Sequence, residues 1–243
     1  YARESLRKGT ETGNCNIENM DSYDFAVQKV VEVGETLLSA RDKGFEVATK
    51  GGNPRDTITS TDMEVNDFLI KEIKKRFPSH GIYSEEGGGT EGTAEYQWAI
   101  DPIDGTANFS RDIPHFSVCL GLLKGGVPVV GAVYNPVTKE LFSFRKGGGA
   151  FLNGKSIHVS AIEDISKAHV FLHAGRKKEM WDWGGRSYRR LLENALKTAN
   201  FSGSALDICF VAAGRTEAVV YGNLNTLDIA AAFGILTEAG GGA

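Results

Sequence analysis

The stretch from Trp98 to Phe109 constrains the fold most, because two carboxylates follow an apolar run there. Residues 98–100 are all apolar and predict a buried strand. Pro102 has no backbone N–H and a fixed φ, so we expect the strand to end near Asp101. A strand that leaves a core and ends in acids places charged side chains where the core meets solvent.

The residues after this strand predict a turn and the start of a helix. Gly105 can adopt backbone conformations that other residues resist, and Thr106 can cap a helix whose free N–H groups face the two carboxylates. These carboxylates, Asp101 and Asp104, repel each other unless a cation lies between them, and Mg²⁺ prefers carboxylate, carbonyl and water oxygens. A helix N-terminus also binds phosphate oxygens. The stretch therefore predicts a metal-dependent phosphate site, although Asp-Pro and Asp-Gly pairs alone are common in ordinary turns.

The order of residues 101–109, Asp-Pro-Ile-Asp-Gly-Thr-Ala-Asn-Phe, resembles the central signature of the inositol monophosphatase family. Members of this family are Mg²⁺-dependent, lithium-sensitive-type phosphatases. The chain carries four motifs in the family order, and the resemblance covers about Asp21 to Ala243. It implies an α+β fold, a layered α/β/α/β/α sandwich of the sugar-phosphatase (inositol monophosphatase/fructose bisphosphatase) type.

The expected domain organisation follows from periodicity and from the same resemblance. Residues 1–20 lack periodicity and are expected to be an N-terminal tail. Residues 21–243 are expected to form a single phosphatase domain. Within it, residues 21–160 would form a metal-binding lobe with an antiparallel sheet, and residues 161–243 a second α/β lobe. Apolar residues at helical spacing predict that the first lobe begins with a helix from Asp21 to Ala40.

Two adjacent acids, Glu85 and Glu86, follow a short predicted strand. Neighbouring side chains on a strand point to opposite faces, so only one of these acids can face a site shared with Asp101. The family pattern at this point is Gly-Glu-Glu, and Ser84 replaces the glycine here. The resemblance implies that Glu85 is a metal ligand.

Asp62 has two candidate roles. Residues 61–64, Thr-Asp-Met-Glu, have the form of a capping box at the start of a helix, where an acid in the first turn offsets the helix dipole. The resemblance implies instead that Asp62 binds the threonine of the central motif, Thr106. On that basis Thr106, Asp62 and Glu85 are the expected catalytic residues.

The segment from Leu227 to Ala232 is predicted to begin the last helix. It resembles the second signature of the family, Trp-Asp-x-Ala-Ala through Glu-Ala-Gly-Gly, and implies that Asp228 completes the second metal site. The resemblance as a whole implies two or three Mg²⁺ ions per site. Their expected ligands are the side chains of Glu85, Asp101, Asp104 and Asp228 and the backbone carbonyl of Ile103.

Small residues at 203–205, Gly-Ser-Ala, open another predicted helix and let a ligand approach the backbone closely. The family places substrate hydroxyls near this position. The expected substrate-binding residues are Asp104, Gly105, Thr106, Gly203, Ser204, Ala205 and Tyr221.

Two departures from the family pattern bear on specificity. Leu227 stands where the family usually has Trp, and Tyr221 stands where inositol-specific members carry a Glu that contacts the ring. Loss of a charged acceptor for a hydroxyl changes specificity more than it changes phosphate chemistry. Inositol monophosphate is the leading substrate, and fructose-1,6-bisphosphatase or histidinol-phosphate phosphatase activity is the alternative within the family.

Residues 149–156 fit the Walker A pattern of P-loop nucleotide-binding proteins. A P-loop lies between a strand and a helix, whereas residues 157–160 continue as extended chain. We therefore expect a turn between two short strands, and nucleotide binding through Lys155 and Ser156 is the disfavoured alternative of another class. A non-catalytic interaction protein that keeps the fold is a third alternative, which the intact set of four carboxylates and Thr106 disfavours.

Two histidines, His169 and His173, lie in a segment that predicts a strand, with no acid between them, and we expect both to be structural.

The composition argues against several other classes of function. The formal net charge of −4, with no sustained basic run, gives no attraction for nucleic acid or anionic membranes. No apolar run approaches the ~20 residues needed to cross a bilayer, and residues 1–20 are too polar for a signal peptide. Three cysteines without paired spacing favour a reducing compartment, so we expect a cytoplasmic protein. The resemblance implies a small phosphate ester as substrate and a homodimer.

Overall fold

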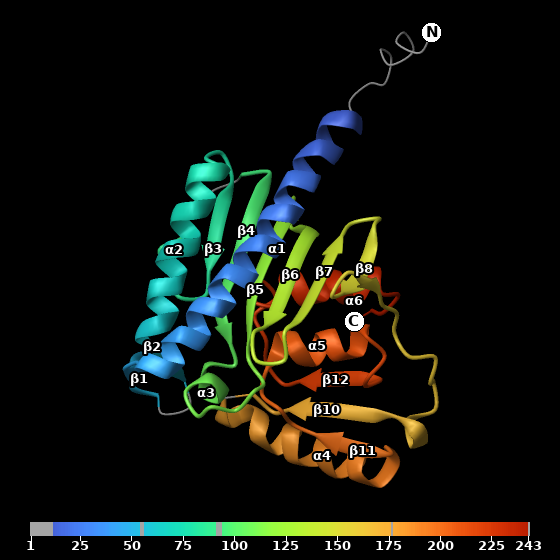
Figure 1. The fold of residues 1–243 in the computed structure, drawn as a ribbon. Coiled ribbons are helices and arrows are strands. Elements are labelled where there is room, and N and C mark those ends of the chain that lie inside the picture. Colours follow the sequence, from blue (N-terminus) through green and yellow to red (C-terminus); the bar gives the residue numbers. More distant parts are fainter. Residues whose placement is uncertain (1–11, 54–55, 91–93, 176, 243) are drawn as a thin grey trace, which may run out of the picture.

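The computed structural model describes residues 12–53, 56–90, 94–175 and 177–242, with side chains from Asp21 onward. Its elements form five layers in the order helix, sheet, helix, sheet, helix (Figure 1). This is the α+β sandwich that we predicted. No helix within the described ranges is long and apolar enough to cross a membrane.

A seven-stranded sheet forms the larger part of the molecule. Its neighbouring strands are antiparallel except for β3 and β4, which run parallel. The sheet thus contains the antiparallel meander that the sequence predicted. In spatial order its strands are β3 (Gly81–Ser84), β4 (Tyr96–Asp104), β5 (Ser117–Lys124), β6 (Val127–Asn135), β7 (Glu140–Arg145), β8 (Gly149–Leu152) and β9 (Lys155–Ser156).

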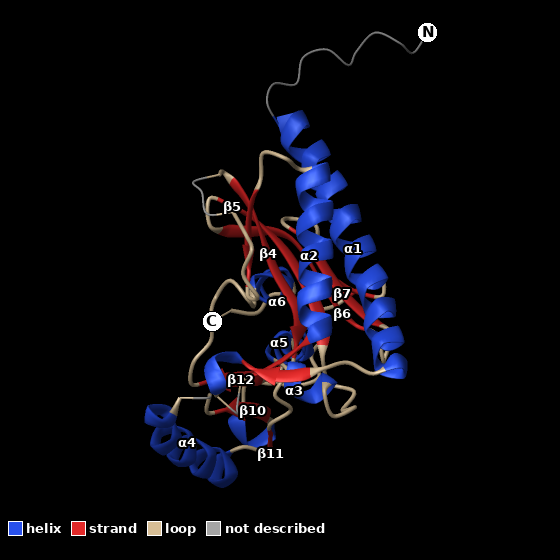
Figure 2. Ribbon diagram, turned by 90° about the vertical axis from the view of Figure 1, so that its left-hand side faces the viewer, coloured by secondary structure: helices blue, strands red, loops and turns tan. Residues whose placement is uncertain are grey.

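Helices cover both faces of this sheet (Figures 1 and 2). Helices α1 (Thr12–Lys43) and α2 (Ser60–Arg76) pack on one face, and α5 (Ser204–Ala212) and α6 (Ala230–Glu238) on the other. Because successive side chains on a strand point to opposite faces, β5 contributes to two cores. Leu120 and Leu122 belong to the core under α1 and α2, and Cys119 belongs to the core under α5 and α6. Burial on both sides explains the almost continuous apolar sequence of β5.

A smaller parallel sheet lies beyond α5, in the order β11-β10-β12. Its strands are β10 (His169–His173), β11 (Lys197–Ala199) and β12 (Ala218–Tyr221), and α4 (Trp181–Asn194) packs against β10 and β11. The chain passes from β10 to one edge through α4 and back to the other edge through α5. Right-handed crossovers in opposite directions place these two helices on opposite faces of the sheet.

The remaining elements are short. They are β1 (Val47–Thr49), β2 (Thr57–Thr59), α3 (Thr106–Phe109) and the 3₁₀ turns η1 (Lys50–Gly52), η2 (Ile165–Lys167) and η3 (Lys178–Met180). Strands β1 and β2 pair as an antiparallel hairpin, and α3 packs against β2.

Two glycines allow α6 to lie directly on the large sheet. A Cβ atom at Gly131 would come within 2.9 Å of the Ala231 Cα, and one at Gly121 within 3.1 Å of the Ala231 backbone N. The contact at Gly131 is closer than Cβ atoms adopt and the contact at Gly121 is tight, so α6 lies against the sheet where these two positions lack side chains. The loop just before α6 carries Asp228.

Two element boundaries differ from the sequence prediction. Helix α1 begins at Thr12, so part of the predicted tail is helical, while residues 1–11 lie outside the described residues. The start of α1 extends beyond the sheet in Figure 1, and a helix there needs no apolar periodicity that a pattern could detect. The neighbouring glycines 184 and 185 favour a loop over residues 176–190 that leads into a helix, but α4 already begins at Trp181. Gly184 serves close packing against Ala174 instead of a turn. The division into lobes at residue 160 stays a prediction.

Candidate active site

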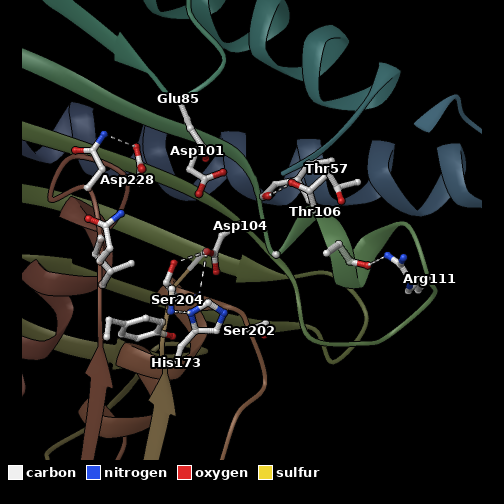
Figure 3. A pocket seen from close by; sticks show the side chains of 18 residues that line it. Thr57, Glu85, Asp101, Asp104, Thr106, Arg111, His173, Ser202, Ser204 and Asp228 are labelled. Atoms are coloured by element: carbon white, nitrogen blue, oxygen red, sulfur yellow. Dashed lines mark hydrogen bonds between the residues drawn. The ribbon is translucent and has the colours of Figure 1, made fainter. Parts of the chain in front are cut away.

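Strand β4 continues past the point where we expected it to end. It pairs with β5 as far as Asp104, with a register shift between the pairs Asp101–Cys119 and Asp104–Ser117. One extra residue on β4 forms a bulge, and a bulge is a position that tolerates Pro102. Residues three apart on a regular strand point to opposite faces, whereas here both carboxylates line one pocket (Figure 3).

Asp101 is buried, and among the described residues no hydrogen bond reaches its carboxylate. Burial raises its pKa well above the usual range, and the nearby charges of Glu85, Asp104 and Asp228 raise it further. A carboxylate in this environment gains most from a cation placed beside it.

Asp104 has the opposite environment, because the start of α5 supplies donors to both of its oxygens. Its Oδ1 accepts hydrogen bonds from the Ser204 backbone N (3.1 Å) and Oγ (2.6 Å), and its Oδ2 accepts one from the Ala205 N (2.9 Å). Burial raises its pKa to about 6, although these hydrogen bonds oppose the shift. Two amides that we had assigned to substrate therefore hold Asp104. Gly203 lies against a ring, since a Cβ there would be 2.7 Å from His115.

Thr106 is the first residue of α3 and does not cap it, contrary to our prediction; the N-cap is Gly105, at φ 87°. The Thr106 Oγ1 lies 2.9 Å from the carbonyl oxygen of Ile103 and 3.3 Å from Oδ1 of Asp62. The predicted pairing of Thr106 with Asp62 is thus present in the geometry, with the Ile103 carbonyl as a second acceptor.

Asp62 makes the contacts of both candidate roles, the helix cap and the pairing with Thr106. It is fully buried, and its Oδ2 accepts hydrogen bonds from the N (2.7 Å) and Oγ1 (2.5 Å) of Thr59. This is a capping box, but it starts at Thr59 and not at Thr61 as the sequence suggested. Burial raises the pKa of Asp62, and the bonds from Thr59 and Thr106 lower it.

Glu85 follows β3 and lines the pocket. Its Oε1 lies 3.0 Å from the ammonium of Lys50, which also lies 2.7 Å from Oε1 of Glu86. Only Glu85 of these two acids lines the pocket, as the strand geometry predicted. Lys50 therefore neutralises charge at the edge of the acidic cluster, and no sequence pattern had indicated this role.

Asp228 lies two residues before α6, and not inside the last helix as predicted. Burial raises its pKa to about 7, with the charge of Glu85 as the next cause. The hydroxyl of Tyr83 and the side-chain amide of Asn225 both donate to its Oδ1.

These side chains surround a pocket of about 520 Å³ (Figure 3). Every predicted metal ligand lines it: Glu85, Asp101, Ile103, Asp104 and Asp228. Of the other predicted residues, Gly105, Thr106, Ser204 and Tyr221 line it, whereas Asp62 lies behind Thr106, and Gly203 and Ala205 are not among its lining residues.

Sequence reasoning missed several residues of the pocket. Arg111 lies at one end of it and His173 at the other (Figure 3). His173 ends β10 directly opposite Tyr221 of β12, and its Nδ1 accepts a hydrogen bond from the Gly175 N (3.0 Å), so we correct our expectation that it serves packing alone. Residues that follow ends of parallel strands often line sites, and this is the signal that could have found it. Thr57, Ala107, Gly175, Ser202, Asn223, Leu224 and Asn225 complete the lining.

Tyr221 lines the pocket with its hydroxyl engaged elsewhere. The hydroxyl donates to Oδ2 of buried Asp207 (2.5 Å), whose Oδ1 lies 2.9 Å from Nε2 of His115. Burial and the charge of Asp207 raise the pKa of Tyr221 far above its usual value. The residue therefore stays neutral and offers the pocket a ring and an oxygen acceptor.

The oxygen ligands that this pocket offers fit Mg²⁺, because carboxylates and the Ile103 carbonyl are hard ligands. Asp101 in particular is buried near four other acids, Glu85, Asp104, Asp228 and Asp62, and no hydrogen-bond donor among the described residues reaches its carboxylate. In the part of the chain that the structure describes, no three acidic, histidine or cysteine side chains form one compact ligand group. Glu85, Asp104 and Asp228 are each turned toward the protein partners given above.

Comparison with known proteins agrees with this geometry. The sequence profile of the inositol monophosphatase family matches residues 17–243. An inositol monophosphatase from Dictyostelium discoideum is 35% identical over 230 residues, covering 91% of this chain and 84% of that protein. A fructose-1,6-bisphosphatase/inositol-1-monophosphatase from Thermotoga maritima is 33% identical over 222 residues, covering 91% and 84%.

A solved structure shows the same fold. The extragenic suppressor protein SuhB from Bartonella henselae superposes with a TM-score of 0.83 at 29% identity, over 93% of this chain and 85% of that one. Family profile, relatives and fold thus coincide over nearly the whole chain. This protein belongs to the inositol monophosphatase family and is a phosphoric monoester hydrolase.

Proposed function

We propose that this chain hydrolyses a small phosphomonoester with Mg²⁺ as cofactor, and that inositol monophosphate is its leading substrate. The observation that carries the proposal is the bulge in β4, which turns Asp101 and Asp104 into one pocket beside Glu85, Thr106 and Asp228. An acidic pocket by itself repels phosphate, so a cation is needed for binding.

Glu85, Asp101, Asp104, Asp228 and the Ile103 carbonyl would hold two or three Mg²⁺ ions. Bound there, the ions supply positive charge for the phosphate and leaving oxygens and lower the pKa of a coordinated water. The chain itself needs no covalent intermediate, because these residues offer carboxylates and a hydroxyl whose task is to orient water.

Thr106 and Asp62 orient the attacking water. The Thr106 hydroxyl has one proton and two acceptors, at 2.9 Å on Ile103 and at 3.3 Å on Asp62. When that proton points to Asp62 Oδ1, the Thr106 oxygen can accept a hydrogen bond from the attacking water. Burial raises the pKa of Asp62 and so makes it a better acceptor. Glu85, on the same pocket wall, accepts the proton that the water releases.

The phosphate oxygens would be held at the start of α3, where Gly105 and Thr106 line the pocket. The leaving group would lie toward His173, Tyr221 and Asn223, whose side chains are uncharged or hydrogen-bonded within the protein. Ser204 Oγ, near the boundary of these two regions, would reach a substrate hydroxyl.

Fructose 1,6-bisphosphate is the second candidate. Arg111 lies at the pocket edge, where its guanidinium, among the described residues, makes only long hydrogen bonds of 3.4 Å to the Ala107 carbonyl and 3.5 Å to the Ser110 hydroxyl. A second phosphate would find a cation there, and the Thermotoga relative bears both activities in its name. We also propose that the protein is cytoplasmic and, from the family resemblance, that it forms a homodimer. Light scattering of the purified protein would test the homodimer.

The experiment is phosphate release from inositol 1-phosphate, fructose 1,6-bisphosphate, histidinol phosphate and adenosine 3′,5′-bisphosphate, each with and without Mg²⁺. We expect release that requires Mg²⁺ and is absent in Asp101→Asn, and the best substrate identifies the physiological class. Release that persists undiminished in EDTA would contradict the metal-dependent mechanism.

A further inference from the structure

Three side chains from two distant segments meet at the edge of the pocket. Tyr83 lies in β3, two residues before Glu85, and Asn225 and Asp228 lie in the loop before α6. The Tyr83 hydroxyl donates to Asp228 Oδ1 (3.2 Å), and the Asn225 Nδ2 donates both to the same Oδ1 (3.3 Å) and to the Tyr83 oxygen. The three groups close a triangle of hydrogen bonds.

The two donors converge on one oxygen of Asp228. Among the described residues, no donor reaches its Oδ2, whereas Asp104 has both oxygens hydrogen-bonded. A carboxylate held through a single oxygen cannot rotate freely, yet it keeps the other oxygen available as a ligand. The charges of two acids, Glu85 and Asp104, act on Asp228, and the ammonium of Lys50 opposes them.

The partners of Asp228 are themselves fixed. The Tyr83 ring packs with Leu227 against a small apolar cluster of Ala99, Leu123 and Ala230. The Asn225 Oδ1 accepts a hydrogen bond from the Leu227 N (3.2 Å), which shapes the loop. The ordinary explanation for Tyr83 is strand propensity, but propensity does not account for where its hydroxyl points.

We propose that Tyr83 and Asn225 are positioning residues that orient Asp228 as a ligand for a divalent cation. This rests on the proposed metal-dependent function. Groups that hydrogen-bond a metal ligand fix its orientation, and their loss typically weakens metal affinity about 10- to 100-fold. Tyr83 also joins the strand that leads to Glu85 to the loop of Asp228, so one hydroxyl aligns ligands 143 residues apart in sequence, from 85 to 228.

The test is Mg²⁺ binding by calorimetry to the wild type, Tyr83→Phe, Asn225→Ala and the double variant. Tyr83→Phe keeps the packed ring and removes only the hydroxyl. We expect the dissociation constant to rise about 10-fold or more in each single variant, and the double variant to lose less than the sum because both act through one oxygen. In hydrolysis assays, excess Mg²⁺ should restore kcat with KM for the substrate unchanged, a rescue that a merely structural role would not give.

Tyr23→Phe is the matched control, because it removes a tyrosine hydroxyl bonded to Ser143 Oγ (3.0 Å) on another part of the sheet. It should bind Mg²⁺ as the wild type does. Wild-type affinity in both Tyr83→Phe and Asn225→Ala, with binding lost in Asp101→Asn, would overturn this inference and leave the proposed function intact. A wild type that binds no Mg²⁺ would overturn the proposed function as well. Thermal melts without metal verify that each variant is folded.

Discussion

The two walls of the pocket differ in charge and in how their polar groups are satisfied. One wall is formed where β3 and β4 of the large sheet end, and it carries Glu85, Asp101 and Asp104. The other is formed where β10 and β12 of the small sheet end, and it carries His173 and Tyr221 (Figure 3). The first wall concentrates negative charge, while the second is neutral and hydrogen-bonded inward.

This difference separates chemistry from recognition. The acidic wall is unfavourable by itself, because burial raises the pKa values of Asp101 and Asp104. Repulsion from Glu85 and Asp104 adds to the shift at Asp101, and repulsion from Asp207 adds to the shift at Asp104. The neutral wall costs little, because the hydroxyl of Tyr221 and the Nδ1 of His173 have partners within the protein. We infer that the phosphate chemistry constrains the first wall and that the leaving group selects the second.

The largest effect is expected from Asp101→Asn, which breaks the acidic wall. Asp101 is a proposed Mg²⁺ ligand, and a bound metal ion contributes several kcal/mol to stabilising charge in the transition state. Its loss should therefore lower kcat by about 10³-fold or more. The metal-free protein should become more stable, by on the order of 1 kcal/mol at neutral pH, because a buried anion without a donor is removed. Activity assays and thermal melts in EDTA measure the two effects.

The pH dependence sharpens the same prediction. The folded-state pKa values of these carboxyls lie above their unfolded values, so the folded protein binds protons more readily. That contribution is present at low pH and is lost as the pH rises through about 6 for Asp104 and about 7 for Asp228. The metal-free wild type should therefore lose stability as the pH rises from about 4, the ordinary value for Asp, to about 7, and more steeply than Asp101→Asn. A flat profile for both proteins would contradict the electrostatic account.

Thr106→Ala should have the next largest effect. It removes the hydroxyl that bridges Asp62 and the Ile103 carbonyl and leaves all carboxylates in place. We expect kcat to fall about 10²-fold with Mg²⁺ affinity nearly unchanged. Steady-state kinetics and calorimetry together separate this outcome from loss of a ligand, and Thr106→Ser should recover part of the rate.

Tyr221→Phe tests the neutral wall and should have a smaller effect. The ring remains, but buried Asp207 loses a donor, so stability should fall by about 1 kcal/mol. We expect relative kcat/KM values among the phosphate esters to change by about 10-fold or less, with the same Mg²⁺ requirement. An equal loss for every substrate would show that this wall does not select the leaving group.

Lys155→Ala should be nearly silent. Lys155 is exposed in β9, which pairs with β8 through the turn at Asn153 and Gly154, and residues 157–164, which follow directly, are not helical. Phosphatase activity should stay within about 2-fold of the wild type, as for most surface substitutions. Nucleotide binding that depends on Lys155 would revive the P-loop alternative, which this hairpin geometry opposes.

The sequence predicted what depends on local pattern. The strands of the meander, the hairpin at residues 149–156 and the helix start near Asp62 follow from periodicity and turn chemistry. The family motif added the expected ligands, and the structure places all of them around one pocket.

Residues whose roles depend on the tertiary fold could not be found in this way. Tyr83 and Asp228 are distant in sequence, and nothing local to either indicates that they meet. The same holds for Lys50, which reaches Glu85 from the β1–β2 hairpin loop. Ser204 and Ala205 were expected to face substrate, yet the nearest anion to the start of α5 is Asp104, which takes their amides.

Because β4 has a bulge, the number of residues between Asp101 and Asp104 is itself a requirement of the site. Substitutions at positions 102 and 103 preserve that count, so they can accumulate while both carboxylates keep facing the pocket. Deletion of either residue would remove the bulge. The two carboxylates would then stand two positions apart on one side of a regular strand, but the extra residue and its backbone carbonyl between them would be lost, with every acid still present in the composition. Relatives with this fold should therefore tolerate substitutions at positions 102 and 103 far better than insertions or deletions there.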